Sequence, residues 1–231
     1  MMKIFYFILF QLLAGAVLAQ THQRNAVVSD PVIDAQFGDL QQKRKSKGET
    51  EGTYFLWDVD PRGVMYGVNG DTTSQVVFNY NINGDYFEIA NMDKKWVVNG
   101  EQLIGFHVRE LNALTSSYYV RLSGREDIPD GFFKVLFASS MYQLLEHVIV
   151  DFYPSNYNAI TDSGYEYDRY VKSNVYYLLV EDELLEESKS TKKIVKAINE
   201  VDSRVKSHVK KEGLDVNRLS SVVEVLSFVS S

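Results

Sequence analysis

The chain has 231 residues, a formal net charge of −7 and no cysteine. The absence of cysteine excludes disulfides, thiolate metal sites and a cysteine nucleophile. The acidic balance argues against nucleic acid as a partner, because neutralising phosphates requires a basic surface.

Residues 1–19 have the pattern of a secretory signal peptide. Lys3 supplies positive charge, an uncharged apolar run covers 4–13, and Ala19 places a small residue at the cleavage site before Gln20. An uncleaved anchor is the alternative, but this run is shorter than the ~20 residues that span a bilayer. We therefore expect an exported protein, periplasmic or extracellular, with no transmembrane segment in the mature chain. The lack of cysteines in an exported chain favours a bacterial source.

Residues 20–52 show no periodicity and include a basic run at 43–47. This composition predicts a flexible, solvated leader. A contact between the basic run and phosphate or an anionic surface is the alternative, but no aromatic residue or helical pattern supports it.

Residues 53–187 have the pattern of an antiparallel β domain. Three Asn-Gly pairs, Asn69-Gly70, Asn83-Gly84 and Asn99-Gly100, separate short apolar and aromatic runs. Because Asn-Gly readily takes positive φ at both central positions of a two-residue hairpin turn, the three pairs predict a meander. The predicted strands cover 54–57, 64–68, 75–80, 86–90, 96–98, 102–109 and 118–122.

The segment 132–152 satisfies both the helical and the strand period. We predict a hairpin, because β-branched and aromatic residues dominate its second arm; a helix over 139–150 is the alternative. The Asn- and Tyr-rich stretch 154–170 predicts a long loop, and 175–180 predicts another strand that turns back through Glu181-Asp182-Glu183.

The end of the chain, 188–231, has the pattern of two helices. Ser190 or Thr191 can cap the first, and Gly213 is placed to end it in the left-handed conformation. Asp215 or Asn217 can cap the second. The apolar faces are formed by Ile194, Ala197, Ile198, Val201, Val205 and Val209, and by Leu219, Val222, Val223, Leu226 and Val229.

These elements together predict an α+β fold. We expect an antiparallel β-meander that is strongly curved or half-barrel-like, and a C-terminal αα-hairpin that packs on it. Several segments carry a resemblance: 131–136, the arm 142–145, the pair Tyr176-Tyr177, and the lysine-rich helices around 192–193 and 210–214. In these segments the chain resembles a family of exported Bacteroidota proteins of uncharacterised activity. The resemblance implies a signal peptide, a β-rich body and two final helices, and it implies no site residues.

The sequence carries little that indicates a catalytic or metal-binding site. No nucleophile-elbow motif is present, and His107, His147 and His208 lack the spacing of metal ligands. His107 is predicted on the solvent face of its strand, opposite Phe106. Asp58 and Asp60 faintly resemble a calcium loop, but a turn explains them better. We predict no cofactor and no metal, and we name no catalytic residue; a hydrolase with a dispersed site stays open.

Aromatic residues in strands are the best remaining functional signal. Adjacent pairs must direct one ring to each face of a sheet, so Tyr118-Tyr119 and Tyr176-Tyr177 are the candidate binding residues. Packing between strands is the alternative explanation for these rings. We interpret the chain as an exported, non-catalytic protein that binds an unknown protein or glycan through its sheet. A carrier of an apolar ligand in a half-barrel cavity is a second hypothesis.

Overall fold

The computed structural model describes residues 50–91, 94–109, 116–158 and 160–231. The predicted signal peptide, its cleavage site between Ala19 and Gln20, and the leader up to residue 49 lie outside these ranges. No helix within the described ranges is long and apolar enough to cross a membrane.

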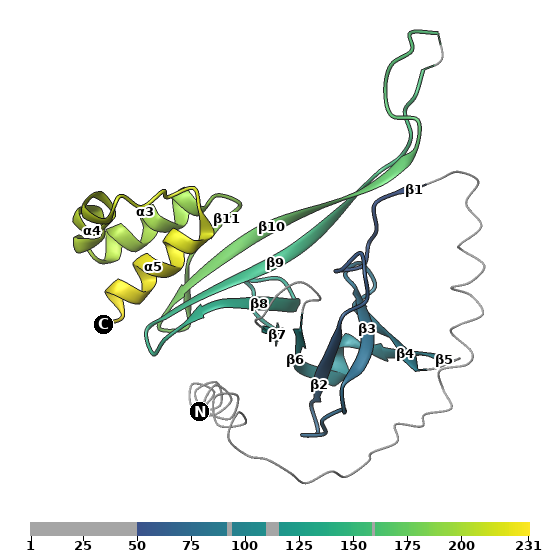
Figure 1. Ribbon diagram of the computed structural model, residues 1–231, viewed down its shortest axis with the longest axis horizontal. Coiled ribbons are helices and arrows are strands. Elements are labelled where there is room, and N and C mark those ends of the chain that lie inside the picture. Colours follow the sequence, from purple (N-terminus) through teal and green to yellow (C-terminus); the bar gives the residue numbers. More distant parts are fainter. Residues whose placement is uncertain (1–49, 92–93, 110–115, 159) are drawn as a thin grey trace.

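The described part of the chain forms an α+β structure with one large, mostly antiparallel sheet and three helices that follow it (Figure 1). The sheet is open, and its strand order is β1-β10-β9-β8-β7-β6-β2-β3-β4-β5, with β11 also paired to β10. The strands are β1 (Thr50–Glu51), β2 (Arg62–Gly67), β3 (Val76–Asn81), β4 (Tyr86–Asn91), β5 (Lys94–Asn99), β6 (Leu103–Arg109), β7 (Ser116–Leu122), β8 (Gly131–Ala138), β9 (Tyr142–Tyr153), β10 (Asp168–Val180) and β11 (Glu183–Ser188). Among these described strands, only β1 is parallel to its neighbour, and it begins inside the predicted leader.

The strand order is not that of one continuous meander. Strands β2 to β5 are consecutive neighbours, as are β6 to β11, but β6 pairs with β2 instead of β5. The connection after β5 is the short 3-10 helix η1 (Gly100–Gln102), which Asn99 caps by accepting a hydrogen bond from the backbone N–H of Glu101. The pair Asn99-Gly100 therefore begins a crossover, and the predicted hairpin turn at this position is wrong.

The other two Asn-Gly pairs also differ from the prediction. Gly70 has positive φ, but it lies in a longer β2–β3 connection; Gly84 has no positive φ, and Asp85 takes that conformation instead. The two-residue hairpin with positive φ at both central residues is Glu181-Asp182, between β10 and β11. Neighbouring groups hold this turn, since Asp182 accepts hydrogen bonds from Arg125 and Gln143.

A core of aromatic rings lies between two groups of strands that are distant in the sheet. Phe87 on β4 and Phe132 on β8 have ring centroids 5.1 Å apart, although β3, β2, β6 and β7 separate their strands in the sheet order. Phe106 on β6 contacts both rings and stacks on Tyr119 of β7 at 4.5 Å. This core is formed by Met65, Phe78, Tyr80, Phe87, Leu103, Phe106, Val108, Tyr119 and Phe132.

The segment 132–152 is a hairpin, as predicted, formed by β8 and β9. Strand β9 and the longer β10 pair over twelve positions, from Tyr142–Val180 at one end to Tyr153–Arg169 at the other. This ribbon runs past the edge of the sheet and continues into residues 154–158 and 160–167. Asp168 to Tyr170 belong to β10 instead of the predicted loop (Figure 1).

Three helices, not two, follow the sheet: α3 (Thr191–Val201), α4 (Arg204–Glu212) and α5 (Leu219–Val229). The first predicted helix is divided at Asp202, whose carboxylate accepts a hydrogen bond from the backbone N–H of Arg204 and so begins a new helix. Gly213 ends α4 in the left-handed conformation, as predicted, and the N–H of Leu214 binds the carbonyl of Val209.

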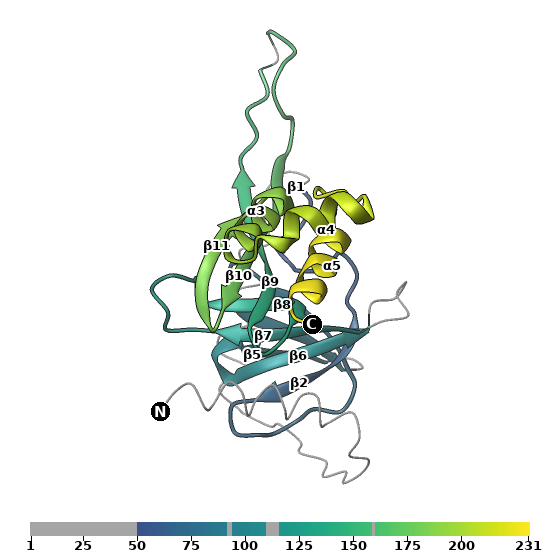
Figure 2. The same cartoon turned by 90° about the vertical axis from the view of Figure 1, so that its left-hand side faces the viewer.

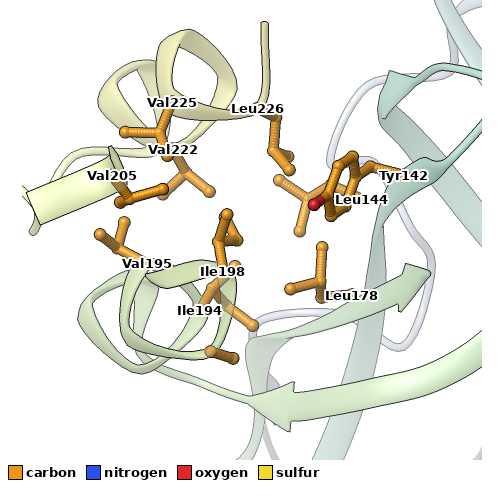
Figure 3. Packing of buried hydrophobic residues seen from close by; sticks show 11 residues of the cluster. Tyr142, Leu144, Leu178, Ile194, Val195, Ile198, Val205, Val222, Val225 and Leu226 are labelled. Carbon is orange, nitrogen blue, oxygen red and sulfur yellow. The ribbon is translucent and has the colours of Figure 1, made fainter. Parts of the chain in front are cut away.

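The helices pack on the end of the β9–β10 ribbon that begins at Tyr142. Ile194 and Ile198 of α3 meet Val222 and Leu226 of α5, and these side chains face Leu144 and Leu178 of the sheet (Figure 3). Burying each such aliphatic side chain is worth about 1.5–3 kcal/mol, which is enough to fix short helices on a sheet. Val201, predicted on the buried face, is 43% exposed.

Candidate functional site

Each of the two tyrosine pairs, Tyr118-Tyr119 and Tyr176-Tyr177, has one buried ring. Tyr119 stacks on Phe106 in the aromatic core, and Tyr177 is buried on the other face of the sheet beside Phe133. Tyr176 is half-buried beside the helices, and only Tyr118 is an exposed member of these pairs. The structure does not bring the four rings together, because the pairs lie on strands β7 and β10 with β8 and β9 between them.

Tyr118 belongs to a small polar cluster with His107 and Tyr66. The Tyr66 hydroxyl and His107 Nδ1 are 2.7 Å apart, and the rings of His107 and Tyr118 have centroids 5.5 Å apart. Partial burial lowers the pKa of His107, and burial together with the nearby Tyr118 raises the pKa of Tyr66. Both groups are therefore neutral near pH 7, and the cluster presents a hydrogen-bonding surface without charge.

The other two described histidines are packed among aromatic rings. His147 stacks on Phe133 at 4.5 Å and lies 3.2 Å from the carbonyl oxygen of Phe132, so Nδ1 carries the proton. Burial lowers the pKa of His147 and keeps its ring neutral. His208 stacks on Phe228 at 3.9 Å in the helical layer. Their partners, a carbonyl oxygen and aromatic rings, are those of structural histidines.

The carboxylates near the start of the sheet serve as structural ties. Asp60 accepts a hydrogen bond from Asn79, and Asp58 pairs with Lys172 of β10 at 2.9 Å. No group of three or more His, Asp or Glu side chains in the described residues is arranged to hold a metal ion. The contacts of Asp58 and Asp60 tie this loop to β10 and β3.

The most conspicuous surface feature is the projecting end of the β9–β10 ribbon, residues 152–171, which we call the arm. Figures 1 and 2 show it extending away from both the sheet and the helices. Ile160 at its tip is 95% exposed, the largest exposed fraction among the exposed large hydrophobic residues. Half of the exposed large hydrophobic residues in the described part of the chain lie here: Phe152, Tyr153, Tyr157, Ile160, Tyr165 and Val171.

The described residues at the end of the arm, 155–158 and 160–166, are ordered by hydrogen bonds among themselves and with Asp168. Asn158 and Ser163 exchange two backbone hydrogen bonds, and the Asn156 side chain accepts one from the backbone N–H of Tyr165. The Tyr157 hydroxyl donates to Asp162, and Ser155 donates to the carbonyl oxygens of Tyr165 and Glu166. The tip thus has a defined conformation before it meets any partner, which reduces the entropy lost on binding.

Ring contacts fix the base of the arm. On one face Phe152 packs on Tyr170, which contacts Tyr54 at 5.3 Å. On the other face the Arg169 guanidinium lies 3.2 Å above the ring of Tyr165 and within 5.5 Å of the ring of Tyr153. These contacts hold the exposed rings in place and remove the entropic penalty of ordering them in a complex.

The sequence predicts an irregular loop over 154–170, and the arm is not apparent from that pattern. The signal that could have found it is compositional: tyrosines at 153, 157, 165, 167 and 170 are unusual for a solvated loop.

Comparisons of the chain with family models, with curated proteins and with solved structures found no match.

Proposed function

We propose that the protein is an exported, non-catalytic binding protein that engages a partner through its β-sheet, with the arm as the contact surface. The observation that carries the proposal is the set of exposed aromatic and aliphatic side chains on a pre-ordered projection. Exposed apolar side chains gathered on one feature mark interaction sites, whereas scattered single ones do not. Tyrosine is favoured at such sites because it buries a large area with few rotatable bonds.

The proposed architecture is a half-barrel-like, strongly curved sheet whose one end is covered by helices packed as a hairpin. The contact between Phe87 and Phe132 supports the curvature, since a flat sheet would separate these strands by about 24 Å at about 4.8 Å per strand. Rings of Phe78, Phe87 and Phe106 fill the space between the two groups of strands. This filling favours binding at the surface over carriage of an apolar ligand inside.

The alternative of a hydrolase with a dispersed site has less support. A catalytic histidine needs a nucleophile within hydrogen-bond reach. His107 meets the hydroxyl of Tyr66, whose raised pKa keeps it protonated and a poor nucleophile, and His147 meets a backbone carbonyl. A screen of ester, glycan and peptide substrates tests this alternative. Turnover that disappears in His107→Ala or His147→Ala would overturn the non-catalytic proposal.

Binding through the arm is tested by immobilising the protein and screening arrays of glycans and peptides and a panel of purified envelope proteins. Ile160→Asp and Tyr157→Ser should each abolish a hit that the wild type shows, because they remove apolar area from the tip. Val59→Asp is the matched control, since Val59 is also an exposed aliphatic residue but lies in a loop outside the arm. A hit that survives both tip changes, or that Tyr118→Ala abolishes instead, would place the binding surface elsewhere on the sheet.

A further inference from the structure

The arm is acidic as well as apolar. It contains three carboxylates, Asp162, Glu166 and Asp168, and one cationic side chain, Arg169, whose guanidinium lies on the ring of Tyr165, so its net charge is −2. Asp162 and Asp168 accept hydrogen bonds within the arm, and Glu166 is exposed. A surface that receives the tip should therefore combine apolar area with positive charge.

The helical layer of the same chain has this combination. Residues 189–218 contain nine basic and four acidic residues. Each of the four acids has a basic partner: Lys196–Glu200, Arg204–Asp202, Lys211–Glu212 and Arg218–Asp215. The exposed lysines 192, 193, 206 and 210 are in excess of these pairs, on the solvent faces of α3 and α4.

Apolar area is available at the same place. Val201, at the end of α3, is the only large hydrophobic residue of the described helices that is exposed. The alkyl stems of the neighbouring lysines add to it, because lysine keeps only its ammonium group in water. The carboxylates of β11, including Glu183 and Glu187, border this layer on the side of the sheet and would direct an acidic tip towards α3 and α4.

The two surfaces lie at opposite ends of one ribbon. The helices pack where β9 begins and β10 ends, and the arm projects from the other end (Figure 1). Twelve residues of β9 span about 40 Å at about 3.3 Å per residue. One tip therefore cannot fold back on its own helices, but two chains placed antiparallel would bring each tip to the helices of the other. A two-fold axis satisfies both contacts at once, as closed dimers require.

We propose that the arm of each chain docks on α3 and α4 of a second copy and forms an antiparallel, two-fold symmetric dimer. The proposal rests on the proposed function of the arm as a contact surface, and it names the partner. The apolar core of the contact is Ile160 with Tyr157 against Val201, and Glu166 meets the excess lysines at the rim. A bilayer surface fits the tip less well, because anionic lipids repel its carboxylates.

Sedimentation equilibrium of the purified protein tests the dimer, from about 1 to about 200 µM and at about 50 and about 500 mM salt. The wild type should dimerise, and Ile160→Asp should remain monomeric throughout. Glu166→Lys and Lys206→Glu should each weaken association by about tenfold. The double variant should recover most of the loss, because the reversed charges face one another again. Glu126→Lys is the matched control, since it changes the same charge in the exposed β7–β8 loop and should dimerise like the wild type.

A wild type that is monomeric at every concentration would overturn the dimer, as would a dimer that Ile160→Asp leaves intact. Either result would leave the proposed function standing if the tip changes still abolish a hit in the binding screen. Vesicles of phosphatidylcholine with and without phosphatidylglycerol complete the experiment. Co-sedimentation of a monomeric wild type with vesicles that Ile160→Asp abolishes would assign the tip to lipid and overturn the proposal.

Discussion

Asp85 joins three parts of the chain that are far apart in sequence. Its carboxylate accepts hydrogen bonds from the Tyr80 hydroxyl and from both terminal nitrogens of Arg121, and its backbone carbonyl accepts one from the N–H of Gly100. Burial, together with the charge of Asp85, raises the pKa of Tyr80, which keeps the phenol protonated as a donor. This network ties the β3–β4 turn to β7 and to the crossover after β5.

The ion pair of Asp85 should stabilise the protein far more than a surface pair of the same geometry. The side chain of Arg121 is 9% exposed, and both Arg121–Asp85 and Arg125–Asp127 are bidentate, at 2.9 and 2.7 Å. Asp85→Asn leaves a nearly buried guanidinium without its counter-charge, and we expect a loss of about 2–3 kcal/mol. Asn is chosen because it tolerates the positive φ of Asp85.

Asp127→Asn is the control and should cost less than about 1 kcal/mol, because exposed pairs are screened. Urea denaturation of the two variants and the wild type measures both values. Equal losses would mean that solvent reaches Arg121 as freely as it reaches Arg125.

At the scale of single residues, the sequence predicts which face of a strand a side chain points to, but it does not predict which distant residue that side chain contacts. Alternation along β6 correctly placed Phe106 in the core, opposite His107. Alternation along β7 likewise directed the two rings of Tyr118-Tyr119 to opposite faces, and one of them is buried. Which ring was buried depended on the pairing of β7 with β6 and β8. The pairing of Asp85 with Arg121, 36 residues away, depends on the crossover and has no local signal.

At the scale of elements, the periodicity of 194–209 correctly predicts helix but not the break within it. Asp202 accepts hydrogen bonds from the backbone N–H and the side chain of Arg204, which offers the backbone an alternative to continuing α3. The new axis of α4 keeps Val205 buried and carries Val201 to the surface. An Asp-Ser pair inside an apolar period was the available signal.

The break gives Val201 and Val222 opposite roles. Val222 is 0% exposed and packs on Ile198, so Val222→Asp should cost several kcal/mol by desolvating an unpaired carboxylate. Val201→Asp should change the free energy of unfolding by less than about 0.5 kcal/mol, the usual range at exposed sites. Thermal and urea denaturation should be measured on dilute protein, so that association between copies does not contribute. A large loss from Val201→Asp would show that α3 and α4 form one continuous helix.

The Asn-Gly pairs predicted some of the chain reversals but not the conformation of the turns. Asn-Gly predicted reversals at 69–70 and 83–84, and chain reversals occur there, but Gly84 lacks positive φ because the connection from Ile82 to Asp85 is longer than two residues. The tight turn falls at Glu181-Asp182, where contacts from Met141, Gln143 and Arg125 stabilise strained backbone. Long-range contacts thus override the local preference.

At the scale of the whole molecule, the class of fold follows from the sequence, whereas strand order and the arm do not. Predicted strands and final helices are enough for an α+β assignment. The pairing of β6 with β2 closes contacts between residues such as Phe87 and Phe132, which are 45 positions apart, and no period in the sequence specifies it. The arm was missed for a related reason, because its pairing partners alternate poorly in polarity.

The arm also separates function from stability within one ribbon. The hydrogen bonds found for the described residues of 155–166 join these residues to one another or to Asp168. The side chains described at 155–158 and 160–166 are exposed, whereas the other end of the ribbon carries the buried residues Leu144, Leu145 and Leu178. Residues that are kept ordered without supporting the core are free to serve a contact.

Replacing residues 155–167 by Asn-Gly, which places position 154 opposite 168 in the register of the ribbon, should therefore leave the fold intact. The two-residue turn matches the twist of the ribbon, and a shorter connection changes the closure entropy by about 1 kcal/mol or less. Urea denaturation of dilute protein should give a midpoint close to that of the wild type, while dimerisation and any hit of the binding screen disappear. Truncating Leu144 to Ala, at the other end of the same ribbon, should instead lower the free energy of unfolding by about 2–5 kcal/mol. A large loss of stability on removing the tip would mean that the arm packs on the body and is not a free contact surface.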